Sequence, residues 1–112
     1  MNLDSETVSL SSGTDLKYDG LIIATGARCR TLPGAENLEG VYTLRGLDDA
    51  LAIRAAFDSK PNRVVVVGAG FIGAEVAATA RDRGLEVSMI EVAPVPFERV
   101  LGADMGEVLA GV

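Results

Sequence analysis

The sequence predicts an α/β fold that is built around one βαβ unit and preceded by a β-rich segment. Three observations support this prediction. Residues 63–67 are an almost uninterrupted β-branched run that leads into a glycine-rich turn. The turn opens a segment of small apolar residues, and a second apolar strand follows within about 30 residues, the usual length of a βαβ unit. Upstream, residues 8–18 alternate apolar and polar side chains around a short turn, which is typical of a hairpin.

The first zone of the chain reads as strands. Residues 8–10 and 15–18 are expected to pair around the turn at residues 11–14, with one face buried. The continuous apolar run at residues 20–24 is expected to form a short strand that is covered on both faces. This strand is expected to end at Thr25 and Gly26.

The second zone, residues 27–62, begins as a loop and is expected to form a short strand at residues 41–44. A helix is then predicted from Leu47 to Phe57, because its apolar positions recur mostly at helical spacing. Asp48 and Asp49 would lie in its first turn, where carboxylates face the positive end of the helix dipole. Gly46 is the expected N-cap, and residues 59–62 end the helix.

The third zone carries the βαβ unit. A strand is expected at residues 63–67, followed by the glycine turn at residues 68–73, a helix to about Arg83, and a strand at residues 85–90. A last helix is expected to begin at Asp104, with Glu107 three positions on as the second half of a capping box. Two parallel strands leave sheet edges and one face uncovered, so we expect the isolated chain to self-associate or to be only marginally stable.

Composition excludes several classes of protein. With 48% hydrophobic and 23% charged residues in 112 positions, the chain is globular and has room for one modest core. Its formal charge of −6 disfavours nucleic acid as a partner. No apolar run approaches the roughly 20 residues that cross a bilayer, and the N-terminus lacks a secretory pattern. We therefore expect no membrane contact and a cytoplasmic location.

Metal and thiol chemistry find no support in the residue types. The chain has no histidine and one cysteine, Cys29, so it offers neither the common nitrogen ligand of zinc nor an internal disulfide. Without a histidine to activate it, Cys29 is interpreted as an inert loop thiol. No metal site and no catalytic residue are predicted within this sequence.

The glycine turn predicts a phosphate-binding site. Gly68 permits a sharp turn after the strand, Gly70 leaves the backbone open to a pyrophosphate, and Gly73 lets the helix lie close to the sheet. The unpaired amides and positive end of that helix would face the phosphates, so an anion can bind to an acidic protein. The alternative is a tight turn between strand and helix that holds no ligand.

An acidic residue stands where a dinucleotide ribose would lie. Glu91 ends the second strand, 18 residues beyond Gly73, and could accept hydrogen bonds from the adenosine ribose hydroxyls. This favours NAD, because a carboxylate repels the 2′-phosphate of NADP. Arg99 is the nearby basic residue that could accommodate NADP if its loop folds back. A solvated strand end is the alternative reading of Glu91.

These residues also carry a family resemblance. Residues 64–75, which read VVVVGAGFIGAE, and the strand that ends at Glu91 resemble the Rossmann-like NAD-binding domain of the pyridine nucleotide-disulfide oxidoreductase superfamily. Residues 18–27 resemble the ATG segment at the end of the FAD-binding domain in that superfamily. The segments at residues 32–34 and 47–50 resemble the connecting region of its ferredoxin reductase branch.

The resemblance implies a domain organisation. Residues 1–27 would be the C-terminal, β-rich tail of an incomplete FAD-binding domain, and residues 28–62 a connecting segment with a helix. Residues 63–112 would be the N-terminal half of a NAD-binding Rossmann domain. The first glycine fingerprint for FAD has no counterpart before Val8, so the chain is interpreted as an internal fragment of a longer enzyme.

The resemblance also implies roles for single residues. Residues of the glycine turn would hold the NAD pyrophosphate: Gly68, Ala69, Gly70, Phe71, Ile72 and Gly73. Glu91 would hold the adenosine ribose. Glu75 would lie near the nicotinamide end by the flavin, and the alternative is a carboxylate that simply complements the helix dipole. Thr25 and Gly26 would approach FAD.

Three hypotheses about function follow. The first is a fragment of an FAD-dependent oxidoreductase that takes electrons from NADH and passes them through flavin to an acceptor protein such as a ferredoxin. The longer protein would be the enzyme, and the isolated chain, without its FAD and interface segments, is expected to be inactive. The second is a non-enzymatic module for nucleotide binding or assembly. The third is an inactive truncated product that is kept in solution by self-association.

Overall fold

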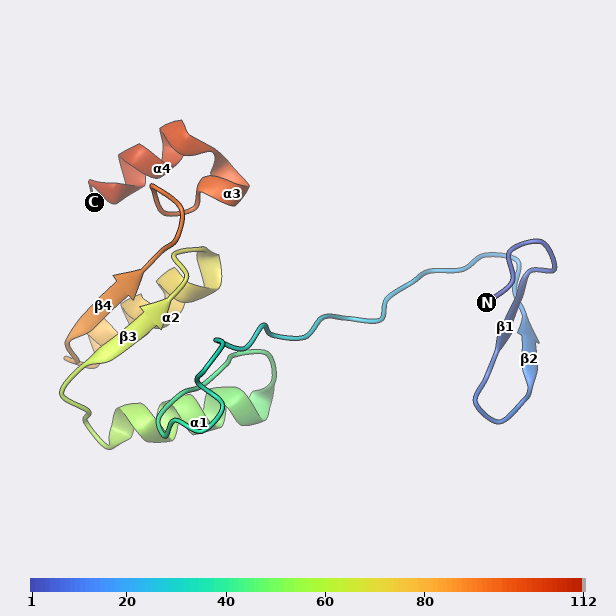
Figure 1. Cartoon of the computed structure of the whole chain (residues 1–112), viewed down its shortest axis with the longest axis horizontal. Coiled ribbons are helices and arrows are strands. Elements are labelled where there is room, and N and C mark those ends of the chain that lie inside the picture. Colours follow the sequence, from blue (N-terminus) through green and yellow to red (C-terminus); the bar gives the residue numbers. More distant parts are fainter. Residues whose placement is uncertain (112) are drawn as a thin grey trace.

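The computed structural model describes residues 1–111 and has two parts joined by a long linker, residues 18–46 (Figure 1). The first part is an antiparallel hairpin of β1 (Thr7–Ser9) and β2 (Asp15–Lys17), in which Val8 lies opposite Leu16. The strands confirm the predicted hairpin to within a residue, but the predicted buried face is wrong. Leu10 and Leu16 are exposed, because no other element packs on the hairpin. The hairpin stands apart from the rest of the chain, and the radius of gyration of 19.8 Å exceeds the roughly 13 Å of a compact domain of this length.

The linker corrects two predictions. Residues 20–24 and 41–44 do not form the expected strands, and Ile22 and Ile23 are 89% and 69% exposed. The physical reason is that a strand needs a partner for its backbone amides and carbonyls. Among residues 1–111 the linker pairs with no strand, so its apolar sequence alone does not produce a β-strand.

Helix α1 (Leu47–Asp58) follows the linker and confirms the helix predicted there. Gly46 is its N-cap, as expected, and provides no capping side chain. Asp49 compensates for the missing cap, because its carboxylate accepts hydrogen bonds from the backbone amides of Gly46 and Arg45, each at 2.9 Å. These two hydrogen bonds hold the pKa of Asp49 below its ordinary value of 3.8, and the bond from Gly46 has the larger effect.

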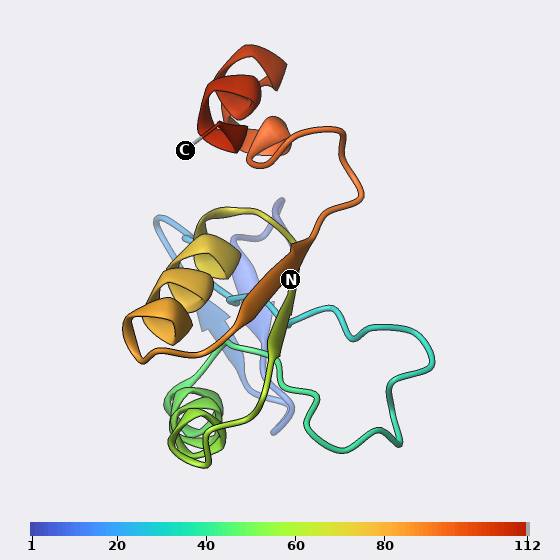
Figure 2. The same cartoon turned by 90° about the vertical axis from the view of Figure 1, so that its left-hand side faces the viewer.

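The βαβ unit is the centre of the second part. Strands β3 (Val64–Val67) and β4 (Val87–Ile90) pair in parallel, and helix α2 (Phe71–Asp82) connects them. In Figure 2, α2 lies against one face of this two-stranded sheet and α1 lies beside it. The core that they enclose contains the following residues: Phe57, Ala80 and Leu85, with Ile53, Val64, Val76 and Val87 packed around them.

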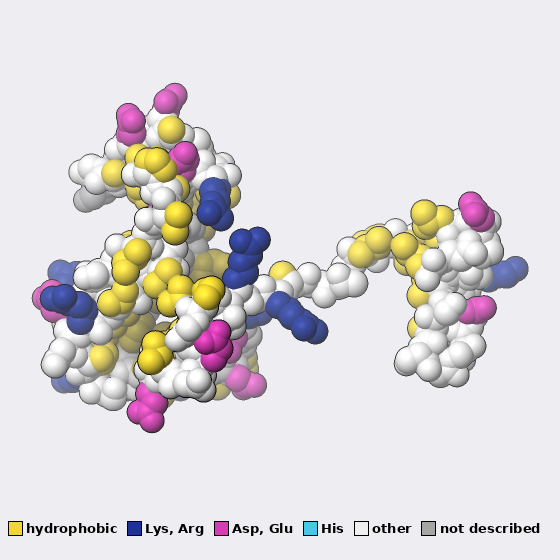
Figure 3. Space-filling model, in the orientation of Figure 1, with side chains coloured by type: hydrophobic (Ala, Val, Ile, Leu, Met, Phe, Trp, Pro, Cys, Tyr) yellow, Lys and Arg dark blue, Asp and Glu magenta, His cyan; other side chains and the backbone are white. Residues whose placement is uncertain are grey.

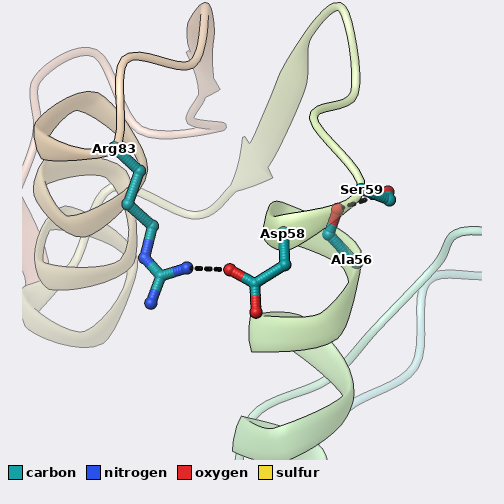
Figure 4. Close-up of polar contacts among 4 residues, drawn as sticks. All are labelled: Ala56, Asp58, Ser59 and Arg83. Atoms are coloured by element: carbon teal, nitrogen blue, oxygen red, sulfur yellow. Dashed lines mark hydrogen bonds and ion pairs between the residues drawn. The ribbon is translucent and has the colours of Figure 1, made fainter.

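An ion pair joins the ends of the two helices. Arg83, just after α2, donates to the carboxylate of Asp58 at the end of α1, with 2.6 Å between Nη1 and Oδ1 (Figure 4). Both side chains are exposed, so the pair contributes little to stability, at most about 1 kcal/mol. Apolar contact of Phe57 with the core is the stronger attachment of α1.

Two short helices end the described chain. Helix α3 (Glu98–Leu101) was not predicted, and α4 (Ala103–Ala110) begins one residue before the expected start. The predicted capping box is wrong, because Gly102 and not Asp104 is the N-cap. Gly102 has φ of 81°, a left-handed conformation that bends the chain between the two helices and places Asp104 inside α4.

One face of the sheet is uncovered. The side chains of Val65, Val67 and Ile90 are each more than half exposed, whereas Val66 is buried. This follows from the alternation of side chains along a strand, because Val66 faces α2 and its neighbours face away. Figure 3 shows hydrophobic side chains gathered on this side of the second part.

We expect the isolated chain to self-associate through this uncovered face. Its sedimentation coefficient should rise with protein concentration, because association would bury Val65 and Val67. The double variant Val65→Lys/Val67→Lys should sediment as a monomer. Leu47→Lys, which changes a 73% exposed residue of α1, serves as the control and should associate like the wild type. A wild-type chain that stayed monomeric at every concentration would contradict the expectation.

Candidate functional site: the glycine turn and the end of β4

The glycine turn leaves the carboxyl end of β3 and opens α2. Gly68 has φ of 107°, which only glycine adopts readily, and its amide donates to the carbonyl of Ile90 at 2.7 Å. Within the described residues, the amides of residues 70–73 donate to no acceptor, and the first internal bond of the helix runs from Ala74 to Gly70. The turn therefore presents several unpaired donors at the positive end of α2.

Gly73 and Gly70 differ in their surroundings. A Cβ on Gly73 would collide with the carbonyl oxygen of Gly68 and would lie 3.3 Å from a methyl group of Val66. This confirms that Gly73 permits close packing of helix and sheet. A Cβ on Gly70 would meet no atom within 4 Å, so the space beside Gly70 is open.

Glu91 lies next to the turn because β4 runs parallel to β3 and ends beside it. One carboxylate oxygen accepts a hydrogen bond from the amide of Ala69 at 2.7 Å. The other accepts hydrogen bonds from the amides of Val92 and Ala93 at 2.7 and 3.0 Å. These bonds, with the Ala93 bond as the largest influence, hold the pKa of Glu91 below its ordinary value of 4.5. The nearby charge of Arg99 acts in the same direction.

The segment after Glu91 also reaches the turn, through a residue that the sequence did not single out. The amide of Phe97 donates to the carbonyl of Ala69 at 2.9 Å. The rings of Phe97 and Phe71 are 5.3 Å apart between centroids and tilted by 52°. No periodic pattern marks Phe97, and its position after two prolines was the one available signal that the chain turns there.

The remaining predicted residues lie elsewhere. Glu75 is exposed on α2 and helps to line a groove of about 320 Å³ between α1 and α2, together with Ile53, Phe57 and Ile72. Thr25 and Gly26 are exposed on the linker, where a guanidinium nitrogen of Arg45 lies 3.6 Å from the position of a Cβ on Gly26. The structure thus brings together residues 68–73 and Glu91, but not Glu75, Thr25 or Gly26.

In the part of the chain that the structure describes, no helix has the length and apolar character needed to cross a membrane. Among residues 1–111, no three side chains of the types that ligate metals lie close enough together to hold an ion.

Comparison with known proteins decides the family. Residues 2–112 match the family described as pyridine nucleotide-disulphide oxidoreductase. The chain belongs to this family.

Two proteins with similar sequences are named as reductases. The chain is 43% identical to the ferredoxin reductase component of chlorobenzene dioxygenase from Cupriavidus sp. (strain PS12), over 99% of this chain and 27% of that protein. It is 46% identical to rhodocoxin reductase from Rhodococcus erythropolis, over 91% of this chain and 24% of that protein. This member of the pyridine nucleotide-disulphide oxidoreductases thus spans about a quarter of the length of such relatives.

A solved structure supports the same relationship. The ferredoxin reductase for the CYP199A2 system from Rhodopseudomonas palustris superposes with a TM-score of 0.73 at 41% identity. The match covers 97% of this chain and 27% of that one. The mixed helix and strand architecture therefore fits part of a pyridine nucleotide-disulphide oxidoreductase.

Proposed function

We propose that this chain carries the dinucleotide-binding turn of an NADH-dependent, FAD-containing ferredoxin reductase. In the longer protein, electrons would pass from NADH through flavin to a ferredoxin or a similar acceptor protein. The observation that carries the proposal is the set of unpaired amides at residues 70–73, beside open space at Gly70 and next to the carboxylate of Glu91. Relatives whose names describe ferredoxin reductases support the choice of acceptor.

The domain assignment is part of this proposal. Residues 1–27 would belong to the end of an FAD-binding domain, residues 28–62 to the connection, and residues 63–112 to the first half of a Rossmann-like NAD-binding domain. The start of β3 at Val64 supports the boundary at residue 63, and the boundary at residue 28 lies within the linker between β2 and α1.

The residues of the turn fit a dinucleotide. The free amides of Gly70, Phe71 and Ile72 would donate to the pyrophosphate, assisted by the dipole of α2. Gly68, Ala69 and Gly73 would shape the turn around it. Glu91 would accept an adenosine ribose hydroxyl with the one lone pair that its three backbone bonds leave free, on Oε2. Its charge disfavours a 2′-phosphate, so we propose NAD rather than NADP as the bound form.

The flavin contacts depend on the longer protein. Thr25 and Gly26 are exposed on an extended segment. We propose them as FAD contacts on the family resemblance, and Glu75 as a residue near the nicotinamide. When bound, FAD supplies the two-electron to one-electron conversion that a ferredoxin requires.

NADH titration of the isolated chain tests the proposal. Calorimetry should detect binding to the wild type, and Gly70→Val should weaken the affinity by at least about tenfold, because the new side chain would fill the open space beside the amides. The fold should persist in this variant, since φ of Gly70 is −92° and a Cβ meets no neighbour. Equal affinity of both proteins, or no NADH binding by a folded wild type, would contradict the assignment.

Flavin absorbance on the same sample separates the alternatives. A bound yellow cofactor that NADH bleaches supports oxidoreductase activity in this chain. NADH binding without flavin supports a nucleotide-binding module, which the observed turn alone would suffice to build.

A further inference from the structure

Phe97 has a backbone conformation that is rare for a bulky residue. Its φ and ψ are 59° and 5°, in the left-handed region that residues other than glycine normally avoid. A residue persists in such a conformation only where its surroundings hold it, and positions of this kind gather at ligand-binding sites. Phe97 is held by its amide bond to Ala69, by its ring contact with Phe71, and by the amides of Val100 and Leu101, which both donate to its carbonyl.

The peptide groups of Ala69 are fixed from two sides by the segment that follows β4. The amide of Ala69 donates to Glu91, and the carbonyl of Ala69 accepts from Phe97. Ala69 is 5% exposed, so water cannot readily replace either partner. These bonds set the orientation of the backbone immediately before Gly70.

Helix α4 supports the same segment from behind. A Cβ on Gly106 would collide with a methyl group of Val95 and would lie 2.6 Å from the carbonyl oxygen of Pro96. Gly106 is buried, so α4 packs its backbone directly on residues 95 and 96. A continuous set of contacts therefore runs from α4 through residues 95–97 to the glycine turn.

We propose that Phe97 is a positioning residue that fixes the glycine turn in the shape that receives the pyrophosphate. Its amide orients Ala69, its ring holds Phe71 at the first position of α2, and Gly106 allows α4 to keep it in place. The effect on NADH affinity rests on the proposed function, whereas the effect on the shape of the turn does not.

Amide hydrogen exchange without nucleotide tests the effect on the turn. In Phe97→Gly, which relaxes the backbone and removes the ring, the Ala69 amide should exchange about tenfold faster relative to core amides such as that of Ala80. Gly106→Ala, which pushes on residues 95 and 96 from behind, should produce the same local change. Phe97→Tyr should retain wild-type exchange, because it keeps the ring and the backbone amide.

A matched control separates this effect from simple relief of backbone strain. Lys60 also has positive φ, 54°, but lies at the end of α1, so Lys60→Gly should leave Ala69 exchange unchanged. NADH affinity should fall about fivefold in Phe97→Gly and stay constant in Phe97→Tyr and Lys60→Gly. Unchanged Ala69 exchange in Phe97→Gly would overturn the proposal. A wild type that binds no NADH would instead overturn the proposed function and the affinity effect, with the exchange result still deciding the role of Phe97 in the turn.

Discussion

Gly73→Ala should destabilise the βαβ unit by about 1–3 kcal/mol and abolish NADH binding. The added Cβ would collide with the carbonyl oxygen of Gly68 and crowd Val66, which is a buried strand residue. A backbone carbonyl cannot move aside as a flexible side chain can, so α2 must shift away from the sheet. That shift would also displace the free amides of the turn. The midpoint of urea unfolding and an NADH titration measure the two effects.

Gly20→Ala is the matched control for that substitution. A Cβ on Gly20 meets no atom within 4 Å, so the change should leave both stability and affinity as they are. A Gly73→Ala protein with wild-type unfolding midpoint would show that the helix tolerates a wider separation from the sheet, contrary to the expectation.

Glu91→Gln should weaken NADH binding by about tenfold to a hundredfold. The carboxylate accepts three backbone amides, and an amide side chain turns one of its two acceptor oxygens into a donor. At least one amide then faces a donor instead of an acceptor, and the charged partner of the ribose is lost. Glu86→Gln, which removes the same charge from an exposed position just before β4, is the control and should bind as the wild type does.

The same residue predicts a pH dependence. Because the pKa of Glu91 is lowered in the folded protein, its contribution to stability is present above its ordinary value of 4.5 and is lost as pH falls through the lowered folded value. The stability difference between wild type and Glu91→Gln should therefore narrow below about pH 4.5. Urea unfolding of both proteins at a series of pH values measures this difference, and a constant gap would contradict the role of the carboxylate.

The parts of the site that the sequence predicted are those fixed by short-range rules. Gly68, Gly73 and Glu91 follow from what a strand, a turn and a second parallel strand require, and the structure places them as expected relative to one another. Phe97 could not be predicted, because its contact with Ala69 bridges 28 residues and its left-handed backbone carries no sequence signature.

The failed strand predictions have a different cause. Residues 20–24 have the composition of a buried strand, but strand formation depends on a partner, and the described residues provide none. The predicted start of α4 is wrong for a local reason. The chain bends at Gly102, which has a positive φ, so Gly102 rather than Asp104 becomes the N-cap.

The separation of the hairpin from the βαβ unit affects how unfolding should be interpreted. Each sheet pairs strands that are near in sequence, and a hairpin of three-residue strands is marginal in water by itself. The two parts share no core, so each melts according to its own contacts, and one cooperative transition does not describe the whole chain. A free energy measured by chemical denaturation therefore describes the part that contains the core, from α1 onward, and the hairpin unfolds in a separate equilibrium.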